Sequence, residues 1–320
     1  MHRIPDRKYF HAKSADTRFR APELEKVYRL MLILSEINRG ALNGYLALRG
    51  GTAINLCFTK KLPRLSIDID LVLARDGDRE AMLRDRKFVR KQLFGIFKSA
   101  GYAIDSYLNY YALDQFDLRY VNAFGGRDRV KVEINYLASR VPIYPIAKSK
   151  PHNIFDIDLE SVKTLSGMEI YGSKIEALIK RSAPRDLFDV FHLAHNGRMP
   201  SEDISKLRKC TIFSCCVEMN SDFRKSLSSN PADAVDAKQV SNELIPYLRE
   251  GYNFNFASAK NTVGIFCKRL FKLRINEQRF LGEFFDHKQY KPKLLFPNQK
   301  NLAEHPGIKW RLQQMSSNSA

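Results

Sequence analysis

Apolar and polar positions alternate along this chain of 320 residues with two different periods. In the first half, short runs with a period of two are interleaved with runs of helical period, whereas the helical period dominates from residue 173 onward. The elements predicted before that point are a helix over 23–38, a strand over 45–48, a helix over 53–58, a strand over 65–71, a helix over 78–100 and two or three strands over 102–136. The pattern therefore predicts strands among helices, followed by a helical region.

The same pattern divides the chain into four segments. Residues 1–20 carry six Lys or Arg against two acids, and we expect a basic, loosely ordered arm there. Residues 21–165 are predicted to form a core domain of strands and helices, residues 166–314 a mostly helical C-terminal domain, and residues 315–320 a disordered tail.

Two aspartates occupy the strand predicted over 65–71. Apolar residues fill every second position of this strand, so Asp68 and Asp70 project from the same side, with Cα atoms roughly 6–7 Å apart. Two carboxylates about 4–5 Å apart repel by about 3–4 kcal/mol at an effective dielectric of about 20. A shared cation removes that cost, and Mg²⁺ or Mn²⁺ suits carboxylate and phosphate oxygens. The alternative is an exposed strand edge with two solvated aspartates.

A double glycine precedes this strand. Gly50 and Gly51 end the short strand over 45–48, and Thr52 is a candidate N-cap for the helix over 53–58. Glycines at a helix start leave backbone N–H groups open to a phosphate. A double glycine alone is more often a tight turn, but its combination with the two aspartates favours a nucleotide site.

A third acid, Glu133, lies on the polar face of the strand predicted over 129–136. If this strand lies beside the one that carries Asp68 and Asp70, Glu133 becomes a third metal ligand or the general base that deprotonates an attacking hydroxyl. The alternative is an amphipathic edge strand with a solvated polar face.

Residues 172–193 are predicted to form two helices, the first capped by Ser173 and the second opened by Pro184. Lys174 and Arg181 are seven residues apart and therefore share a face of the first helix. Lys174, placed near a helix N-terminus, is a candidate ligand for a triphosphate.

Asp186 in the second of these helices could hold Lys174, Arg181 or a nucleotide ribose in place. The alternative is a plain helical hairpin with solvated charges. We favour that alternative for three further residues: Asp189, His192 and His195.

The net charge of +18 and the pI near 9.7 indicate a polyanionic partner such as RNA. Basic residues gather in the helix over 79–98, with seven Lys or Arg against two acids, and over 260–311, with twelve against four and many interleaved aromatic residues. Basic and aromatic side chains together bind a phosphate backbone and stack unpaired bases. The alternative is a set of amphipathic helices with solvated lysines and core aromatics.

The five cysteines have neither C-x-x-C spacing nor a histidine partner. This favours buried thiols in a reducing compartment over a zinc site or a disulfide framework. Residues 1–20 contain no apolar signal segment, and the longest aliphatic run, 30–34, is too short to span a bilayer. We therefore expect a cytoplasmic protein with no membrane segment.

Four pieces of the sequence, taken in order, resemble the AbiEii/AbiGii family of nucleotidyltransferase toxins. They are Gly50-Gly51-Thr52, Arg64-x-Ser66-x-Asp68-Ile69-Asp70, Lys131-x-Glu133-Ile134-Asn135 and Lys174-Ile175-x-Ala177-Leu178-x-x-Arg181-x-x-x-Arg185-Asp186-Leu187-Phe188-Asp189. The match covers about residues 40–195. The family is similar to the DNA polymerase β-like superfamily. This implies an α+β fold in which a minimal nucleotidyltransferase core, a mixed sheet flanked by helices, precedes a mostly helical C-terminal domain.

The resemblance also implies roles for the matched residues. Asp68 and Asp70 would bind the metal, Lys174 would bind the triphosphate, and Asp186 would be essential. Glu133 stands where many superfamily members have aspartate. The candidate nucleotide-binding residues are Gly50, Gly51, Thr52, Arg64, Ser66, Lys174 and Arg181. Ser66 also stands where some relatives are inactivated by phosphorylation.

The resulting hypothesis is a nucleotidyltransferase that depends on Mg²⁺ or Mn²⁺ and is the toxin of a toxin–antitoxin pair. It transfers a nucleoside monophosphate from a nucleoside triphosphate to an RNA acceptor, which in some relatives is the 3′ end of tRNA, and releases pyrophosphate. The resemblance implies a separately encoded antitoxin as partner. Two alternatives stay open: an inactive nucleotidyltransferase fold that binds RNA or a partner, and a transferase that acts on a protein side chain.

Overall fold

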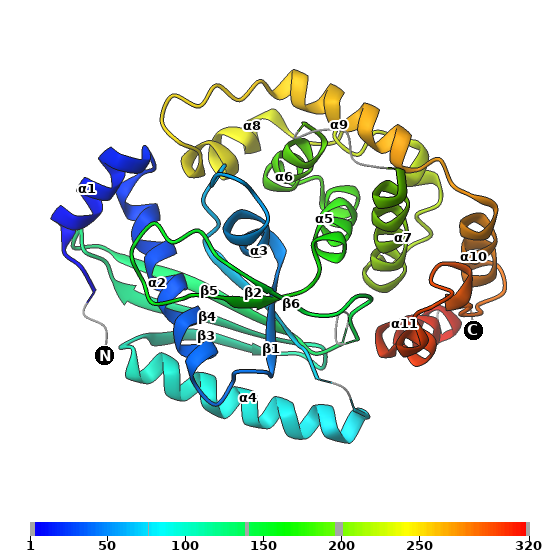
Figure 1. The fold of residues 1–320 in the computed structure, drawn as a ribbon, viewed down its shortest axis with the longest axis horizontal. Coiled ribbons are helices and arrows are strands. Elements are labelled where there is room, and N and C mark those ends of the chain that lie inside the picture. Colours follow the sequence, from blue (N-terminus) through cyan, green and yellow to red (C-terminus); the bar gives the residue numbers. More distant parts are fainter. Residues whose placement is uncertain (1–3, 76, 138–140, 196–200, 318–320) are drawn as a thin grey trace. The chain divides into compact units, whose positions relative to one another are not determined.

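The computed structural model describes residues 4–75, 77–137, 141–195 and 201–317, which divide into two compact units (Figure 1). The first unit comprises Met1–Arg140, Ile146–Leu165 and Ile245–Tyr252. The second comprises Val141–Pro145, Ser166–Leu244 and Asn253–Ala320. The segment Ile245–Tyr252 therefore belongs to the first unit, although most of its sequence neighbours belong to the second.

The first unit contains a seven-stranded mixed sheet with the strand order β3-β4-β5-β2-β1-β7-β6. The strands are β1 (Leu46–Arg49), β2 (Asp68–Leu73), β3 (Ala103–Asn109), β4 (Leu113–Val121), β5 (Arg127–Asn135), β6 (Ala147–Ser149) and β7 (Val162–Thr164). The helices are α1 (Arg7–Thr17), α2 (Ala21–Arg39), α3 (Gly50–Cys57) and α4 (Arg79–Ser99). β2 runs antiparallel to β1 and parallel to β5, which makes the sheet mixed, as the sequence resemblance implies.

Local signals explain where the helices begin. α2 has Pro22 in its first turn, and the side chain of Asp78 accepts a hydrogen bond from the N–H of Ala81 and so caps α4. The expectation of a loosely ordered arm over 1–20 is wrong for Arg7–Thr17, because these residues form α1 and the ring of Phe10 is fully buried.

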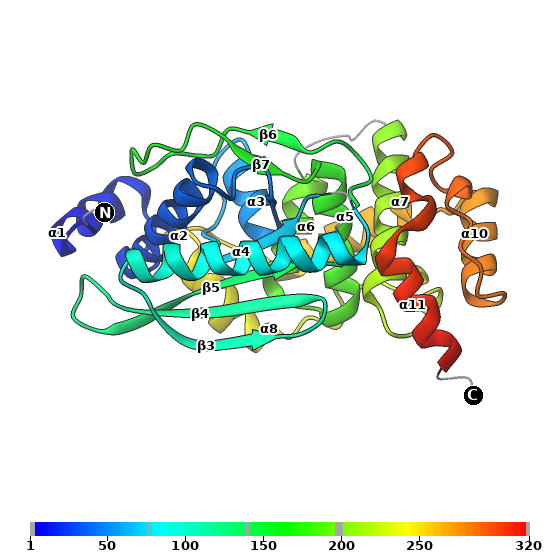
Figure 2. The same ribbon diagram turned by 90° about the horizontal axis from the view of Figure 1, so that it is seen from below.

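The sheet has one apolar face and one polar face. β2, β4 and β5 alternate buried and half-buried residues along their central positions, so each strand gives its apolar side chains to one side. Two helices cover that side: Phe97 of α4 packs edge-on against Phe116 with ring centroids 5.2 Å apart, and Arg29 of α2 lies 3.9 Å over the ring of Tyr120. α4 runs alongside β3, β4 and β5 (Figure 2).

The second unit is built mainly of helices. They are α5 (Gly167–Arg181), α6 (Pro184–His195), α7 (Ser201–Glu218), α8 (Ala237–Gln239), α9 (Phe256–Leu270), α10 (Ile275–Phe285) and α11 (Pro306–Ser317), with short 3₁₀ and π turns between some of them. α11 includes Met315–Ser317, so the expectation of disorder is wrong for these three residues, and 318–320 lie outside the described residues.

Close helix packing holds this second unit together. A Cβ atom on Gly172 of α5 would lie 2.8 Å from the Cβ of Cys210 on α7, so the lack of a side chain lets the two helices approach. All five cysteines are free thiols, and four of them are buried, in agreement with the sequence. No helix in the described part of the chain is long and apolar enough to cross a membrane.

A buried ion pair joins α4 to the apolar face of the sheet. Asp114 of β4 is fully buried, and its carboxylate accepts hydrogen bonds from Arg86 at 2.6 Å, from Arg90 at 3.1 Å, from Tyr107 at 3.1 Å and from Tyr136 at 3.0 Å. Both carboxylate oxygens therefore have donors, which is the condition under which a buried charge is tolerated.

We expect Asp114→Ala to destabilise the protein by about 3–5 kcal/mol, because it leaves the buried Arg86 guanidinium without its counter-ion. The free energy of unfolding from urea denaturation measures this. The control is Asp105→Ala, which removes a solvent-exposed ion pair to Arg119 and should cost about 0–1 kcal/mol. Equal losses in the two variants would contradict a special role for the buried network.

Candidate active site

The parallel pairing of β2 with β5 brings the predicted carboxylates together. In this register Asp70 lies directly beside Glu133, and Asp68 lies directly beside Lys131. Arg49 of β1 lies directly beside Asp70 on the other side of β2. Residues opposite one another on neighbouring strands project from the same face, so three carboxylates and two basic side chains share a patch of the polar face. All five residues are half-buried. The sequence made the role of Glu133 conditional on this adjacency, and the structure meets the condition.

The charges in this carboxylate patch are not balanced. Lys131 Nζ donates a hydrogen bond to Glu133 Oε1 at 3.0 Å. Burial and the adjacent Asp70 nevertheless raise the pKa of Glu133 above its ordinary value, and Lys131 only partly opposes them. For Lys131, burial lowers the pKa, but Glu133 and Asp68 outweigh burial and the net shift is upward. With Asp68, Asp70 and Glu133 against Lys131 and Arg49, the patch has one more acidic than basic side chain.

This donor set fits a hard divalent cation. Mg²⁺ and Mn²⁺ prefer carboxylate oxygens as ligands, and three carboxylates lie on this face of the sheet. Across the described residues, no three His, Cys, Asp or Glu side chains are gathered as ligands of one ion. Asp68 and Asp70, two residues apart on β2, are the residues that could hold such an ion, and Glu133 accepts a hydrogen bond from Lys131.

Gly50 lies against the carboxylate of Asp70. Its φ is +69°, and a Cβ atom there would lie 2.1 Å from Asp70 Oδ2. Two separate requirements thus demand glycine: the left-handed backbone and the space that the carboxylate occupies. The start of α3 and the aspartate strand therefore fit together only when residue 50 has no side chain.

Thr52 also ties the start of α3 to β2, but not as predicted. It lies inside the first turn of α3, which begins at Gly50 and has no side-chain cap, so the expectation of an N-cap is wrong. The fully buried Thr52 hydroxyl donates to the carbonyl oxygen of Asp68 instead. Gly51 is buried as well, and Gly50 is the half-buried residue at this helix start.

Two other predicted nucleotide ligands lie just before β2. Arg64 is only 2% exposed, and its Nη1 donates to the carbonyl oxygen of Leu65 at 2.8 Å. Ser66 is half-buried. Arg64 forms a β-bridge with Leu248, and the N–H of Leu65 donates to the carbonyl oxygen of Tyr247 at 2.8 Å. The segment 245–252 thus holds the chain in an extended form as it enters β2.

A second cluster of charged residues lies in the second unit, where Lys174 and Arg181 of α5 meet Asp186 of α6. Lys174 Nζ donates to Asp186 Oδ1 at 2.8 Å and lies 3.3 Å from Asp189 Oδ2. Arg181 contacts both oxygens of Asp186, at 2.7 and 3.1 Å. Of the three partners considered for Asp186, the structure shows Lys174 and Arg181 in contact with it.

Burial separates the members of this cluster. Lys174, Asp186 and Asp189 are buried, whereas the Arg181 side chain is 63% exposed. Burial alone would raise the pKa of Asp186, but Lys174 and Arg181 outweigh it and hold that pKa well below its usual range. Asp186 therefore stays ionised and joins α5 to α6 at neutral pH.

Several local predictions about these helices need correction. Ser166, not Ser173, caps α5, and Ser173 lies mid-helix with its hydroxyl donating to the carbonyl oxygen of Ile170. Lys174 is consequently not near the helix N-terminus. Pro184 does open α6, as predicted.

The interpretation of Asp189 as a solvated charge is also wrong, since it is 2% exposed and pairs with Lys174. His192 and His195 each lie against an aromatic ring of the same helix, and His195 is exposed to solvent, as the favoured interpretation expects. The sequence offered one signal for Asp189: it follows Asp186 by three residues and so faces the same way. Nothing in the sequence alone identified the pairing of Lys131 with Glu133.

Comparison with known proteins supports one family. Residues 32–257 match the family described as nucleotidyl transferase AbiEii toxin of a type IV toxin–antitoxin system. No curated protein sequence matches the chain.

Among solved structures, the nucleotidyltransferase toxin MenT4 from Mycobacterium tuberculosis H37Rv has a similar fold. Its TM-score is 0.65, with 97% of this chain and 99% of that chain covered at 13% sequence identity. The family match spans more than half of the sequence, and its core contains the sheet with Asp68, Asp70 and Glu133. The chain therefore belongs to the AbiEii family of nucleotidyltransferase toxins.

Proposed function

We propose that this chain transfers a nucleoside monophosphate from a nucleoside triphosphate to the terminal hydroxyl of an RNA, with tRNA as the acceptor that the family resemblance favours. The observation that carries the proposal is the carboxylate patch: Asp68, Asp70 and Glu133 share one sheet face, and the glycine that opens α3 lies against Asp70. A bound Mg²⁺ or Mn²⁺ would supply positive charge to the attacking and leaving oxygens.

In the proposed reaction, the acceptor hydroxyl oxygen forms a bond to the α-phosphorus, and the bond from that phosphorus to the bridging oxygen of the β-phosphate breaks. Pyrophosphate leaves with the bond's electron pair. The hydroxyl proton passes to Glu133, the carboxylate of the patch whose pKa is raised, which makes it a suitable base. Asp68 and Asp70 would hold the cation, and Lys131 keeps Glu133 oriented on the strand.

The remaining residues bind and position the nucleotide. The backbone at Gly50, at the start of α3, is the proposed phosphate contact, supported by the unpaired N–H groups that every helix start presents. Within the second unit, Lys174 fixes α5 to α6 from its buried position, and Arg181 is the exposed basic member of that cluster. Two buried side chains position the segment that leads into β2: Arg64 donates to the carbonyl oxygen of Leu65, and Thr52 donates to that of Asp68.

An RNA acceptor suits the charge of the molecule. A net charge of +18 far exceeds what solubility requires, and a polyanion is the partner it would attract. A protein acceptor would not require that charge. The toxin–antitoxin family also implies a cognate antitoxin.

We expect Asp70→Asn to lower transfer of a labelled nucleotide to RNA by on the order of 100-fold or more, because it removes a charge from the reacting centre. Incubation with cell RNA and each labelled triphosphate in turn, followed by RNase, measures this. Asp85→Asn on α4, which loses an ion pair to Arg75, is the matched control. Label that resists RNase and stays on protein would reject the RNA acceptor, and full transfer by Asp70→Asn would reject the site.

Gly50→Ala should reduce kcat/KM for transfer by about 100-fold, because the new methyl group must displace the Asp70 carboxylate. The matched control is Gly101→Ala: its φ is +77°, but a Cβ atom there meets nothing within 4 Å. Both variants bear the cost of a left-handed alanine, roughly 1 kcal/mol. If both lose activity equally, the contact with Asp70 is irrelevant.

Glu133→Gln should melt at a higher temperature than wild type at about pH 8 without divalent cations. The folded-state pKa of Glu133 is raised, so the stability that its protonated form contributes is present at low pH and is lost as pH rises through that pKa. Glutamine stays uncharged and avoids the loss, so the difference should shrink toward about pH 4. Thermal unfolding across this range measures it, and a variant less stable than wild type throughout would contradict the charge imbalance.

A further inference from the structure

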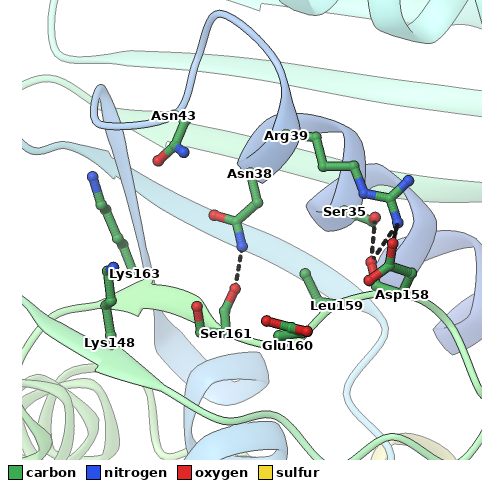
Figure 3. Close-up of a pocket in the computed structure, with 10 residues that line it drawn as sticks. All are labelled: Ser35, Asn38, Arg39, Asn43, Lys148, Asp158, Leu159, Glu160, Ser161 and Lys163. Atoms are coloured by element: carbon green, nitrogen blue, oxygen red, sulfur yellow. Dashed lines mark hydrogen bonds and ion pairs between the residues drawn. The ribbon is translucent and has the colours of Figure 1, made fainter.

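A polar pocket of about 520 Å³ lies in the first unit, apart from the carboxylate patch (Figure 3). The last turns of α2, the loop that follows α2, and the strands β6 and β7 with the loop before β7 line it. Its volume is in the range of sites that hold a small ligand. None of its lining residues belongs to the predicted nucleotide site.

Two lysines face one another at one end of this pocket. Lys148 of β6 and Lys163 of β7 are directly opposed in the antiparallel ladder. Side chains in this relation have Cβ atoms about 4.5–5.5 Å apart, and like charges there are destabilising. Among the described residues, neither ammonium makes an ion pair or a hydrogen bond. The fold therefore keeps an uncompensated pair of positive charges at the pocket wall.

The acids of the pocket do not neutralise this pair. Asp158 is taken by Arg39, which contacts its carboxylate and, at 2.8 Å, its carbonyl oxygen. The Ser35 hydroxyl donates to the same carbonyl oxygen at 2.8 Å. Figure 3 shows this group at one end of the pocket and both lysines at the other, with Glu160 between them. Three basic residues (Arg39, Lys148, Lys163) against two acids (Asp158, Glu160) leave the lining at +1.

Further groups suit an anion at the lysine end. Asn43 lines the pocket on that side and carries an amide donor. Lys163 Nζ lies 3.4 Å from the position of a Cβ atom on Gly44, whose φ is +97°, so the ammonium packs against bare backbone. Paired ammonium groups with a nearby amide donor match the oxygens of a phosphate.

We infer that this pocket binds the phosphate group of a nucleotide-sized ligand between Lys148 and Lys163. The ligand is a free nucleoside monophosphate or one phosphorylated nucleotide of an RNA chain, since the pocket recognises the phosphate that both contain. The inference is independent of the transfer reaction, because it uses none of the residues of the carboxylate patch.

The test compares Lys148→Ala/Lys163→Ala with the control Lys150→Ala/Lys91→Ala. The control loses the same charge from exposed lysines outside the pocket. Thermal unfolding is measured with and without inorganic phosphate and AMP, and binding to an RNA oligonucleotide is measured over a range of salt concentrations. Both pocket lysines are removed together so that relief of their repulsion is visible: without ligand at low salt, this variant should melt above the control.

Two outcomes support the site. If phosphate and AMP raise the melting temperature of wild type and control but not of the pocket variant, the ligand is a free nucleotide. The other supporting outcome is that phosphate and AMP raise no melting temperature, but RNA binds the pocket variant at least about tenfold more weakly than the control. The salt dependence of RNA binding should then also correspond to about one to two fewer phosphate contacts, and the ligand is RNA. Equal behaviour of the two double variants toward all three probes would overturn the inference. These readouts measure ligand binding and not nucleotide transfer, so a failure of this inference and a failure of the proposed transfer reaction are distinguishable.

Discussion

The parallel pairing of β2 with β5 is the constraint on which the rest of the site depends. A shift of β2 by one residue would turn the side chains of Asp68 and Asp70 toward the apolar face of the sheet, where a carboxylate is costly to bury. In the observed register the same strands bury Ile69 and Val132 on one side and set Asp70 beside Glu133 on the other. Packing of the apolar face thus determines which acids become neighbours. On the polar face, this arrangement sets the carboxylates of Asp70 and Glu133 beside each other, where they repel.

The start of α3 is bound to this register as well. Gly50 touches the Asp70 carboxylate, and Thr52 holds the Asp68 carbonyl, so the helix start contacts both aspartate positions. The contact with Asp70 is possible because Gly50 has no side chain, and the contact with Asp68 is a hydrogen bond from the buried Thr52 hydroxyl. The start of α3 and the strand that carries the carboxylates consequently form one connected arrangement and not two separately placed elements.

The sequence predicted those features of the fold and the site that follow from a local hydrophobic period or from a residue with a special backbone preference. Alternation in β2 placed Asp68 and Asp70 on one face, and Pro184 marked the start of α6. Predictions failed where tertiary contacts decide. α1 is ordered because Phe10 is buried, and the Thr52 hydroxyl donates to the carbonyl oxygen of Asp68 on β2 instead of capping its own helix. The ion pair between Lys131 and Glu133 was not predicted, because a two-residue spacing puts both side chains on one face of a strand but does not determine which carboxylate the long lysine side chain contacts.

The segment 245–252 has a consequence for how the protein is made. It supplies the bridge from Leu248 to Arg64 and the carbonyl of Tyr247 that the N–H of Leu65 needs, directly ahead of the aspartate strand. A ribosome has therefore to deliver the chain through Tyr252 before the unit that carries the carboxylates is complete. For a toxin, this order of synthesis delays the finished site until well over half of the polypeptide, including α5 and α6, has left the exit tunnel.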